Sequence, residues 1–241
     1  MIHKTQALVL HHIKYSDTSI IVATYTRAFG RMSFLVQGAR KKNSRMKAGL
    51  FQPLFILDLD MYYKEKRQLQ KIKEARNAHP YQSIPHDYIK TSICLFLAEI
   101  LYKSLREEEP NPELFDFITS HMRVFDLKKQ GLANFHLYFM THLTKYLGFF
   151  PRNNFNESNT CFDSNKGYFT PFKPHHNHYL EKPESEFFHT LLQYDSSQHQ
   201  HLEIPRQSRL KILHALLDFY YLHNPGMGHI QSFEILKETF R

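Results

Sequence analysis

The sequence predicts an α+β chain in which a small five-stranded β-barrel is followed by an all-α helical region. The first 79 residues have the spacing of β-strands, whereas the spacing after Pro85 is helical. The excess positive charge is confined to the strand-like part. We therefore expect a barrel domain at residues 1–80 and a helical domain at residues 81–241, with an irregular insertion at about 151–183.

Five segments of the N-terminal part have the composition of strands. They are Lys4–Ile13, Thr18–Thr26, Met32–Val36, Leu57–Met61 and Leu69–Ala75. Gly30 lies where a tight hairpin requires positive φ, and Lys64-Glu65-Lys66 predicts a second hairpin. An antiparallel barrel of the OB-fold type is the economical arrangement of five such strands, and barrels of this type commonly bind nucleic acids.

The second part of the chain contains apolar stripes at helical spacing. One stripe runs from Ile89 to Leu101, a second from Leu132 to Leu147 with Gly148 as its cap, and a third from Leu210 to Tyr220. A short helix after Ser232 is expected to bury Ile235 and Leu236. These stripes indicate a packed core, and residues 151–183 show no clear period.

The charge distribution indicates a polyanion as the partner of the N-terminal part. Residues 1–79 contain 15 Lys and Arg but 5 Asp and Glu, whereas the remaining 162 residues contain 16 and 18. Such an asymmetry favours a dedicated basic face, although a basic domain without a ligand is the alternative.

The candidate nucleic-acid contacts form two groups. The first is a basic run without acidic residues, between the third and fourth strands: Arg40, Lys41, Lys42, Arg45 and Lys47. The second comes from the two hairpins: Arg31, Lys64, Lys66 and Arg67, with Lys71 and Lys73 on the strand that follows. Long cationic side chains in these positions can reach successive phosphates along one groove, and the alternative is a solvated charged loop. Phe29, Phe34, Tyr62 and Tyr63 are possible stacking residues, but core positions are the favoured interpretation.

Signatures of enzymes, membrane proteins and secreted proteins are missing from the sequence. There is no G-x-x-x-x-G-K-[ST], H-E-x-x-H or G-x-S-x-G pattern, and the glycines form no dinucleotide motif. The longest apolar runs, at 7–10 and 93–98, are too short for a signal peptide or a membrane span. The two cysteines fit a reducing compartment. We expect a cytoplasmic protein that is not an enzyme and needs no cofactor.

Motifs along nearly the whole chain resemble those of the bacterial RecO family of recombination mediators. The N-terminal motifs are Tyr15-Ser16-Asp17, Gly30-Arg31, Gly38-Ala39-Arg40-Lys41 and Gln52-Pro53. The later motifs are Leu147-Gly148-Phe149-Phe150-Pro151, the turn at 220–225 and Ser232-Phe233-Glu234-Ile235-Leu236. The resemblance implies an OB-fold barrel and DNA repair at the nucleoid.

The resemblance also implies what the protein binds. RecO-like proteins bind single- and double-stranded DNA and anneal complementary strands without ATP. With RecR they help RecA to replace single-strand-binding protein on DNA. They also dock the acidic, hydrophobic C-terminal tail of single-strand-binding protein, for which Arg123, Lys128 and Lys129 are candidate rim residues here.

One departure from the family concerns zinc. Many RecO proteins carry a four-cysteine zinc finger after the proline turn, but here that region contains Cys161 alone. We therefore expect a degenerate zinc-finger region without metal, held by Phe149, Phe150, Phe162, Tyr168 and Phe169.

Two other functions remain open at this point. One is an RNA-binding OB-fold protein that acts in translation or ribosome assembly, because composition does not distinguish DNA from RNA. The other, of a different class, is a metal-dependent hydrolase that uses His175, His176 and His178 with Cys161.

Overall fold

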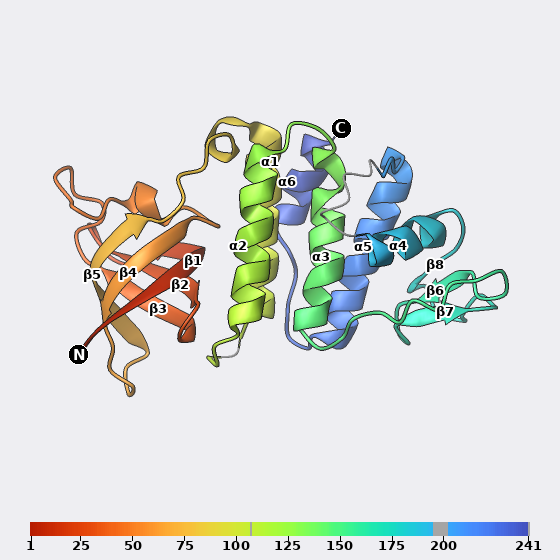
Figure 1. Cartoon of the computed structure of the whole chain (residues 1–241), viewed down its shortest axis with the longest axis horizontal. Coiled ribbons are helices and arrows are strands. Elements are labelled where there is room, and N and C mark those ends of the chain that lie inside the picture. The colour runs from red at the N-terminus through yellow and green to blue at the C-terminus, as the bar shows by residue number, and fades with distance from the viewer. Residues whose placement is uncertain (107, 195–201, 241) are drawn as a thin grey trace. The chain divides into compact units, whose positions relative to one another are not determined.

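The computed structural model describes residues 1–106, 108–194 and 202–240 (Figure 1). These residues form two compact units. Unit 1 consists of residues 1–127 and 230–239, and unit 2 of residues 128–229 with Phe240. Unit 1 contains helices in addition to the barrel, so these units do not divide the chain at residue 80. The predicted domain boundary at residue 80 therefore remains a proposal.

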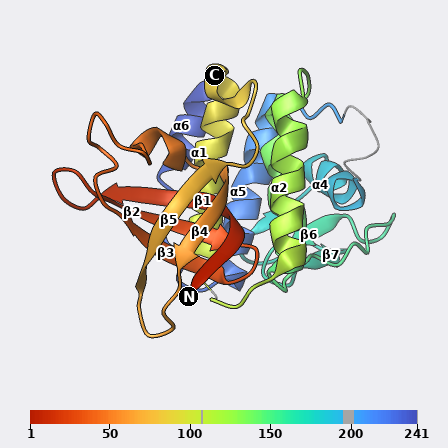
Figure 2. The same cartoon turned by 60° about the vertical axis from the view of Figure 1, so that its left-hand side comes forward.

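The strands of unit 1 form a closed five-stranded barrel, which confirms the predicted fold class. They are β1 (Ile2–Lys14), β2 (Ile20–Thr26), β3 (Gly30–Val36), β4 (Ile56–Tyr62) and β5 (Leu69–Asn77). The order is β1-β2-β3-β5-β4, and every neighbouring pair is antiparallel except β3 and β5. This closure leaves the barrel without free edges, as Figure 2 shows from a second side.

The barrel interior is filled by alternate residues of its strands. Val22, Phe34, Leu57 and Leu59 are among the fully buried members of this core. Alternation puts every second residue of a strand on the inner face, which is why the strand pattern was readable in the sequence. The β2–β3 hairpin turns at Gly30 with φ +61°, as expected.

The outer face of the barrel is also partly buried, because helices of unit 1 pack there. Leu8 and Leu10 of β1 are almost completely buried although they alternate with the interior residues, and β1 contacts α1 (Tyr88–Ser104). The other helices of this unit are α2 (Pro112–Leu127) and α6 (Ser232–Thr239), and α6 packs on α1.

A buried polar cluster joins α1 and α2 to the chain that leaves the barrel. The Asp126 carboxylate accepts hydrogen bonds from the backbone N–H groups of Gln82 (2.7 Å), Ser83 (2.9 Å) and Ile84 (2.9 Å). The buried Lys90 Nζ donates to the Asp126 carbonyl oxygen at 2.6 Å. Burial would raise the pKa of the Asp126 carboxyl, but these hydrogen bonds outweigh burial and lower it.

Unit 2 combines three helices with a small sheet. Its helices are α3 (Phe135–Tyr146), α4 (Glu184–Gln193) and α5 (Arg206–His223). The segment without sequence period forms an antiparallel sheet of β6 (Cys161–Asp163), β7 (Tyr168–Thr170) and β8 (Tyr179–Leu180), with β6 in the middle. Strands of two or three residues are too short to show alternation, so the sequence pattern did not reveal them.

Aromatic packing holds this sheet, as predicted, but with fewer of the predicted residues. The buried Phe162 ring lies 5.2 Å from the Phe169 ring and 4.5 Å from that of Phe188 on α4. Phe150 and Tyr168, which were expected in this core, are exposed. Phe162 packs instead on Phe188 of α4 and on Phe219 of α5.

The helices differ from the sequence prediction in three places. The prediction that Ile235 is buried is wrong, because α6 turns Phe233 and Leu236 inward and leaves Ile235 exposed. The pattern analysis also did not single out α2 and α4. Within the described parts of the chain, no helix combines the length and the apolar character that a bilayer crossing requires.

Candidate nucleic-acid interface

The basic run lies in the loop that connects β3 to β4. Residues 37–47 form irregular turns, and a short 3₁₀ helix follows at Ala48–Phe51. The buried Ala39 accepts a hydrogen bond from the Ala48 N–H at 2.9 Å, and the Arg40 N–H donates to the Thr18 carbonyl at 3.0 Å. The backbone of the loop is therefore anchored to the barrel and to the β1–β2 turn.

The cationic side chains of this anchored loop are exposed. Arg40, Lys41, Lys42, Arg45 and Lys47 all face solvent, and none of them forms an ion pair with a residue that the structure describes. Arg40 Nη1 makes one long hydrogen bond, 3.4 Å, to the Ser16 carbonyl. Five uncompensated cations on a fixed backbone are suited to bind successive phosphates.

The second basic group lies on the β4–β5 hairpin, where Lys64, Lys66 and Arg67 are exposed. The buried side chain of Gln70 forms hydrogen bonds with the backbone of this hairpin turn. Its Nε2 donates to the carbonyl oxygens of Lys64 and Arg67, both at 2.7 Å, and its Oε1 accepts from the Lys64 N–H at 2.9 Å. One buried amide therefore holds the turn in place while its charged side chains point outward.

The two basic groups lie at opposite ends of the barrel. β3 begins near the hairpin and ends where the basic loop begins, and its 7 residues correspond to about 20 Å of strand. Figure 1 shows the β4–β5 hairpin at the lower end of the barrel and the β3–β4 connection at the upper end.

Two lysines of β5 lie between these groups. β5 runs parallel to β3, with Leu35 paired to Lys71, so it leads from the hairpin toward the end of the barrel that carries the basic loop. Lys71 and Lys73 are both exposed, whereas Ile72 between them belongs to the barrel core, so the two lysines lie on the outer face of β5. The cations are thus arranged as a line along β5, which we call the basic line: the loop cations, Lys73, Lys71 and the hairpin cations.

Arg31 has a different environment from the other predicted contact residues. Its Nη1 donates to the carbonyl oxygen of Tyr102 at 2.7 Å and to that of Leu105, at the C-terminal end of α1. Its guanidinium carbon lies 4.6 Å from the centre of the Tyr102 ring. Desolvation by burial lowers the pKa of Arg31 from its usual value. Its side chain therefore caps a helix within unit 1.

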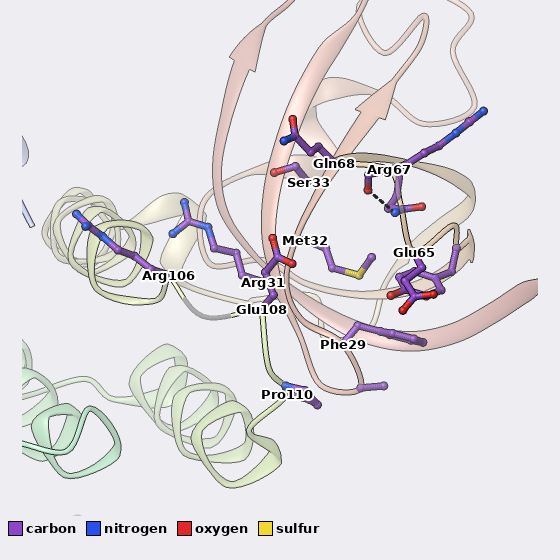
Figure 3. Close-up of a pocket in the computed structure, with 13 residues that line it drawn as sticks. Phe29, Arg31, Met32, Ser33, Glu65, Arg67, Gln68, Arg106, Glu108 and Pro110 are labelled. Atoms are coloured by element: carbon purple, nitrogen blue, oxygen red, sulfur yellow. Dashed lines mark hydrogen bonds between the residues drawn. The ribbon is translucent and has the colours of Figure 1, made fainter. Parts of the chain in front are cut away.

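A cleft of about 470 Å³ opens beside the hairpin. Phe29 and Arg31 from the β2–β3 turn line one side, Tyr63, Glu65 and Gln68 from the hairpin line another, and Glu108 and Pro110 follow α1 on a third. Figure 3 shows the Glu65 and Glu108 side chains on opposite sides of this space, with the Arg67 guanidinium extended away from it.

Sequence reasoning named four residues that line this cleft, Phe29, Arg31, Tyr63 and Arg67, but missed Gln70, Glu108 and Pro110. Gln70 had a readable signal, since it is a polar residue at an inward position of β5. Glu108 and Pro110 had none, because only the tertiary fold brings the chain after α1 to the β2–β3 turn.

The other predicted site residues lie elsewhere. Arg123 is half-buried on α2, next to the exposed Val124 and Leu127, and Lys128 and Lys129 follow directly in the chain. The side-chain Nε of Arg123 is buried and has no hydrogen-bond partner in the described part of the chain.

The histidine cluster makes hydrogen bonds within unit 2. His176 Nε2 lies 3.2 Å from Asp163 Oδ1, and His178 Nδ1 lies 3.0 Å from Asp218 Oδ2. Burial raises the pKa of the Cys161 thiol to about 11, which keeps it protonated at neutral pH. Across residues 1–106, 108–194 and 202–240, no three His, Cys, Asp or Glu side chains are grouped to hold a metal ion.

Comparison with known proteins identifies relatives over the whole length of the chain. The family pattern "Recombination protein O N terminal" matches residues 1–81, and "Recombination protein O C terminal" matches residues 85–229. The protein named DNA repair protein RecO in Azobacteroides pseudotrichonymphae is 35% identical over 240 residues and is covered completely, as is this chain. The proteins of that name in Bacteroides fragilis and Flavobacterium psychrophilum are 36% identical with complete coverage and 38% identical with 98% coverage of both chains.

Proposed function

Because this chain belongs to the RecO family of DNA repair proteins, we propose that it binds single- and double-stranded DNA through the basic line on its barrel. The supporting observation is that the loop and hairpin cations are exposed, have no ion-pair partner among the described residues and are joined by Lys71 and Lys73. Contacts of this kind bind the phosphate backbone and carry no base information.

The proposed activity on this DNA is annealing of complementary strands without ATP. A chain of exposed cations neutralises the repulsion between two phosphate backbones, which is the barrier to bringing strands together. The sequence contains no nucleotide-binding motif, which supports an activity that does not use ATP and a protein that is not an enzyme.

The partner proteins are proposed on the basis of the family. We propose that the chain acts with RecR to assist RecA loading at the nucleoid in the cytoplasm, and that it docks the C-terminal tail of single-strand-binding protein. Val124 and Leu127 are exposed apolar residues at the end of α2, and Lys128 and Lys129 follow them in the sequence, a composition that suits an acidic, hydrophobic tail. Calorimetry with a tail peptide at low salt measures this binding directly, and no heat of binding would contradict the docking proposal.

The DNA-binding proposal is tested by the salt dependence of affinity. If about five phosphates of a single strand are neutralised, log affinity falls against log salt with a slope near −3.5, at roughly 0.7 per contact. The triple variant Arg40→Ala, Lys41→Ala, Lys42→Ala is expected to flatten that slope by about two units. Fluorescence anisotropy titrations of labelled oligonucleotides in a salt series measure both slopes.

A matched control for this variant removes cations from the part of the chain that has no excess of positive charge. The double variant Lys166→Ala, Lys182→Ala removes exposed cations from unit 2 and is expected to leave the slope unchanged. A folded triple variant that keeps the wild-type slope shows that the loop does not contact DNA. Stronger binding of RNA than of DNA of the same sequence would support the translation-associated alternative instead.

A further inference from the structure

The cleft beside the β4–β5 hairpin differs from the basic line in its chemistry. Its lining combines two aromatic residues with carboxylate, amide and guanidinium groups. The aromatic residues are Phe29 and Tyr63, and the polar and charged ones are Glu65, Glu108, Gln68, Gln70, Arg31, Arg67 and Arg106. A planar ligand with apolar faces matches the aromatic pair, and hydrogen-bond donors on its edges match the carboxylates.

The aromatic wall of the cleft is preorganised. The Phe29 and Tyr63 rings lie 5.1 Å apart, tilted by 35°, and the His3 ring contacts both, at 5.4 Å and 5.7 Å. Both residues pack on the barrel core while they remain half-exposed toward the cleft. A half-exposed aromatic pair held from behind can stack against a planar ligand without first losing side-chain entropy.

The opposite wall is held rigidly as well. Gly30 approaches the Glu108 and Glu109 carbonyl oxygens so closely that a Cβ on Gly30 would lie 2.6 Å from the Glu109 oxygen. The Asn111 N–H donates to the Tyr25 hydroxyl at 3.2 Å, and Arg31 binds the end of α1. These contacts fix the chain that carries Glu108 against the β2–β3 turn.

We propose that this cleft binds one nucleobase of single-stranded DNA, with the base stacked on the Phe29–Tyr63 wall. This proposal rests on the proposed DNA binding and adds a base-binding site to its phosphate contacts. The cleft volume of about 470 Å³ accommodates one base with its sugar. Glu65, Glu108 and Gln68 supply acceptors for the amino groups that bases present on their edges.

The position of the cleft fits the path of a strand along the basic line. Lys64, Lys66 and Arg67 belong to the same hairpin as Tyr63 and Glu65, and Figure 3 shows Arg67 extended away from the cleft. The outer side of the hairpin thus meets the phosphates while its inner side meets a base. A base in a duplex is paired and stacked, so the cleft acts on single strands only.

The experiment compares base-dependent with phosphate-dependent binding. Wild-type protein is titrated by anisotropy with a single-stranded oligonucleotide and with one of equal length in which every base is replaced by an abasic site. The phosphates are the same in number, so the salt slope stays the same, whereas the affinity for the abasic strand is expected to be about tenfold lower. Equal affinities for the two strands would overturn the proposal.

The variants Tyr63→Leu and Phe29→Leu locate the effect. Each is expected to weaken binding of the normal strand about five- to tenfold, to leave the abasic strand unaffected and to keep the salt slope. Tyr62→Leu is the matched control, because Tyr62 is the neighbouring exposed tyrosine and does not line the cleft. Melting curves of all variants verify folding, and the abasic comparison on wild type does not depend on them.

The outcomes separate this proposal from the DNA-binding proposal. A protein that binds neither strand at low salt contradicts DNA binding itself. A protein that binds both strands with one affinity and a steep salt slope retains the phosphate contacts and has no base site. Equal losses for Tyr62→Leu and Tyr63→Leu would also overturn the assignment of the cleft.

Discussion

At the scale of single residues, Glu99 shows how one side chain joins segments that are far apart in the sequence. This residue of α1 accepts hydrogen bonds from the Gln231 N–H at 3.0 Å and the Ser232 N–H at 2.8 Å, at the start of α6. Lys103 Nζ lies 2.7 Å from its carboxylate. Burial would raise the pKa of the Glu99 carboxyl, but the hydrogen bonds from Lys103 and Ser232 outweigh it and lower the pKa to about 2.

The depressed pKa predicts how stability depends on pH. A carboxyl with a lower pKa in the folded state stabilises the fold above its unfolded pKa of 4.5, and this contribution is lost as the pH falls toward 2. Glu99→Gln is therefore expected to lower the free energy of unfolding at pH 7 by about 2–3 kcal/mol. Urea unfolding at pH 7 and pH 3 should show a smaller difference between variant and wild type at the acidic pH.

The control for this prediction is Glu186→Gln. Glu186 pairs with Lys182 at 2.7 Å, but both side chains are about half exposed, so we expect a loss of roughly 0–1 kcal/mol. If Glu99→Gln loses no more stability than this control at pH 7, the α1–α6 connection contributes less than the hydrogen bonds indicate.

At the scale of elements, the β2–β3 hairpin is defined by its packing as well as by its turn. Gly30 has φ +61°, and a Cβ there would collide with the carbonyl oxygens of Glu108 and Glu109. The sequence pattern predicted the positive φ of Gly30. The close contact with the Glu108 and Glu109 carbonyl oxygens exists only in the folded chain.

A comparison of two Gly→Ala variants distinguishes these two effects at Gly30 from the general effect of a glycine replacement on backbone entropy. Gly30→Ala is expected to lower the free energy of unfolding by about 2–3 kcal/mol, because strain at positive φ adds to the backbone collision. Gly49→Ala is the matched control, since its Cβ would meet no atom within 4 Å, and it should leave stability within about 0.5 kcal/mol. Denaturant unfolding of both variants measures the difference, and equal midpoints would contradict the close contact at Gly30.

At the scale of the whole molecule, the last helix belongs to the same unit as the N-terminal barrel. Ile230, Phe233 and Leu236 are almost completely buried in unit 1, where α6 packs on α1. α1 in turn contacts β1, whose Leu8 and Leu10 are almost completely buried. DNA binding is therefore best measured on the full chain, because residues 1–80 alone would expose this apolar face.

Truncation after His229 tests this organisation. Each of the three side chains contributes roughly 1.5–3 kcal/mol when buried, so their joint loss is a large part of the typical 5–15 kcal/mol of a domain. We expect the truncated chain to melt far below wild type, and the single variant Lys237→Ala, which changes one partly exposed side chain of α6, to melt normally. Calorimetric melting curves decide this, and an unchanged melting temperature would contradict the grouping of α6 with unit 1.

Sequence alone was sufficient for the features that depend on local periodicity. All five barrel strands, both hairpins and the stripes that became α1, α3 and α5 were predicted within a few residues. Local alternation and helical spacing record which face of an element is buried, so they can be read without knowledge of its neighbours. The basic loop was predicted from local composition, since residues 40–47 contain five cations and no acid.

Tertiary structure alone decided which distant segments meet. The parallel β3–β5 pair places Lys71 and Lys73 between two basic groups, and the packing of α1 takes Arg31 into a helix cap. The cleft depends on Glu108 reaching the β2–β3 turn. Such contacts form between segments that are far apart in the sequence and share no local pattern. They are stabilised because the segments bury apolar surface against each other. A sequence lists the residues of such a site, but only the fold brings them together.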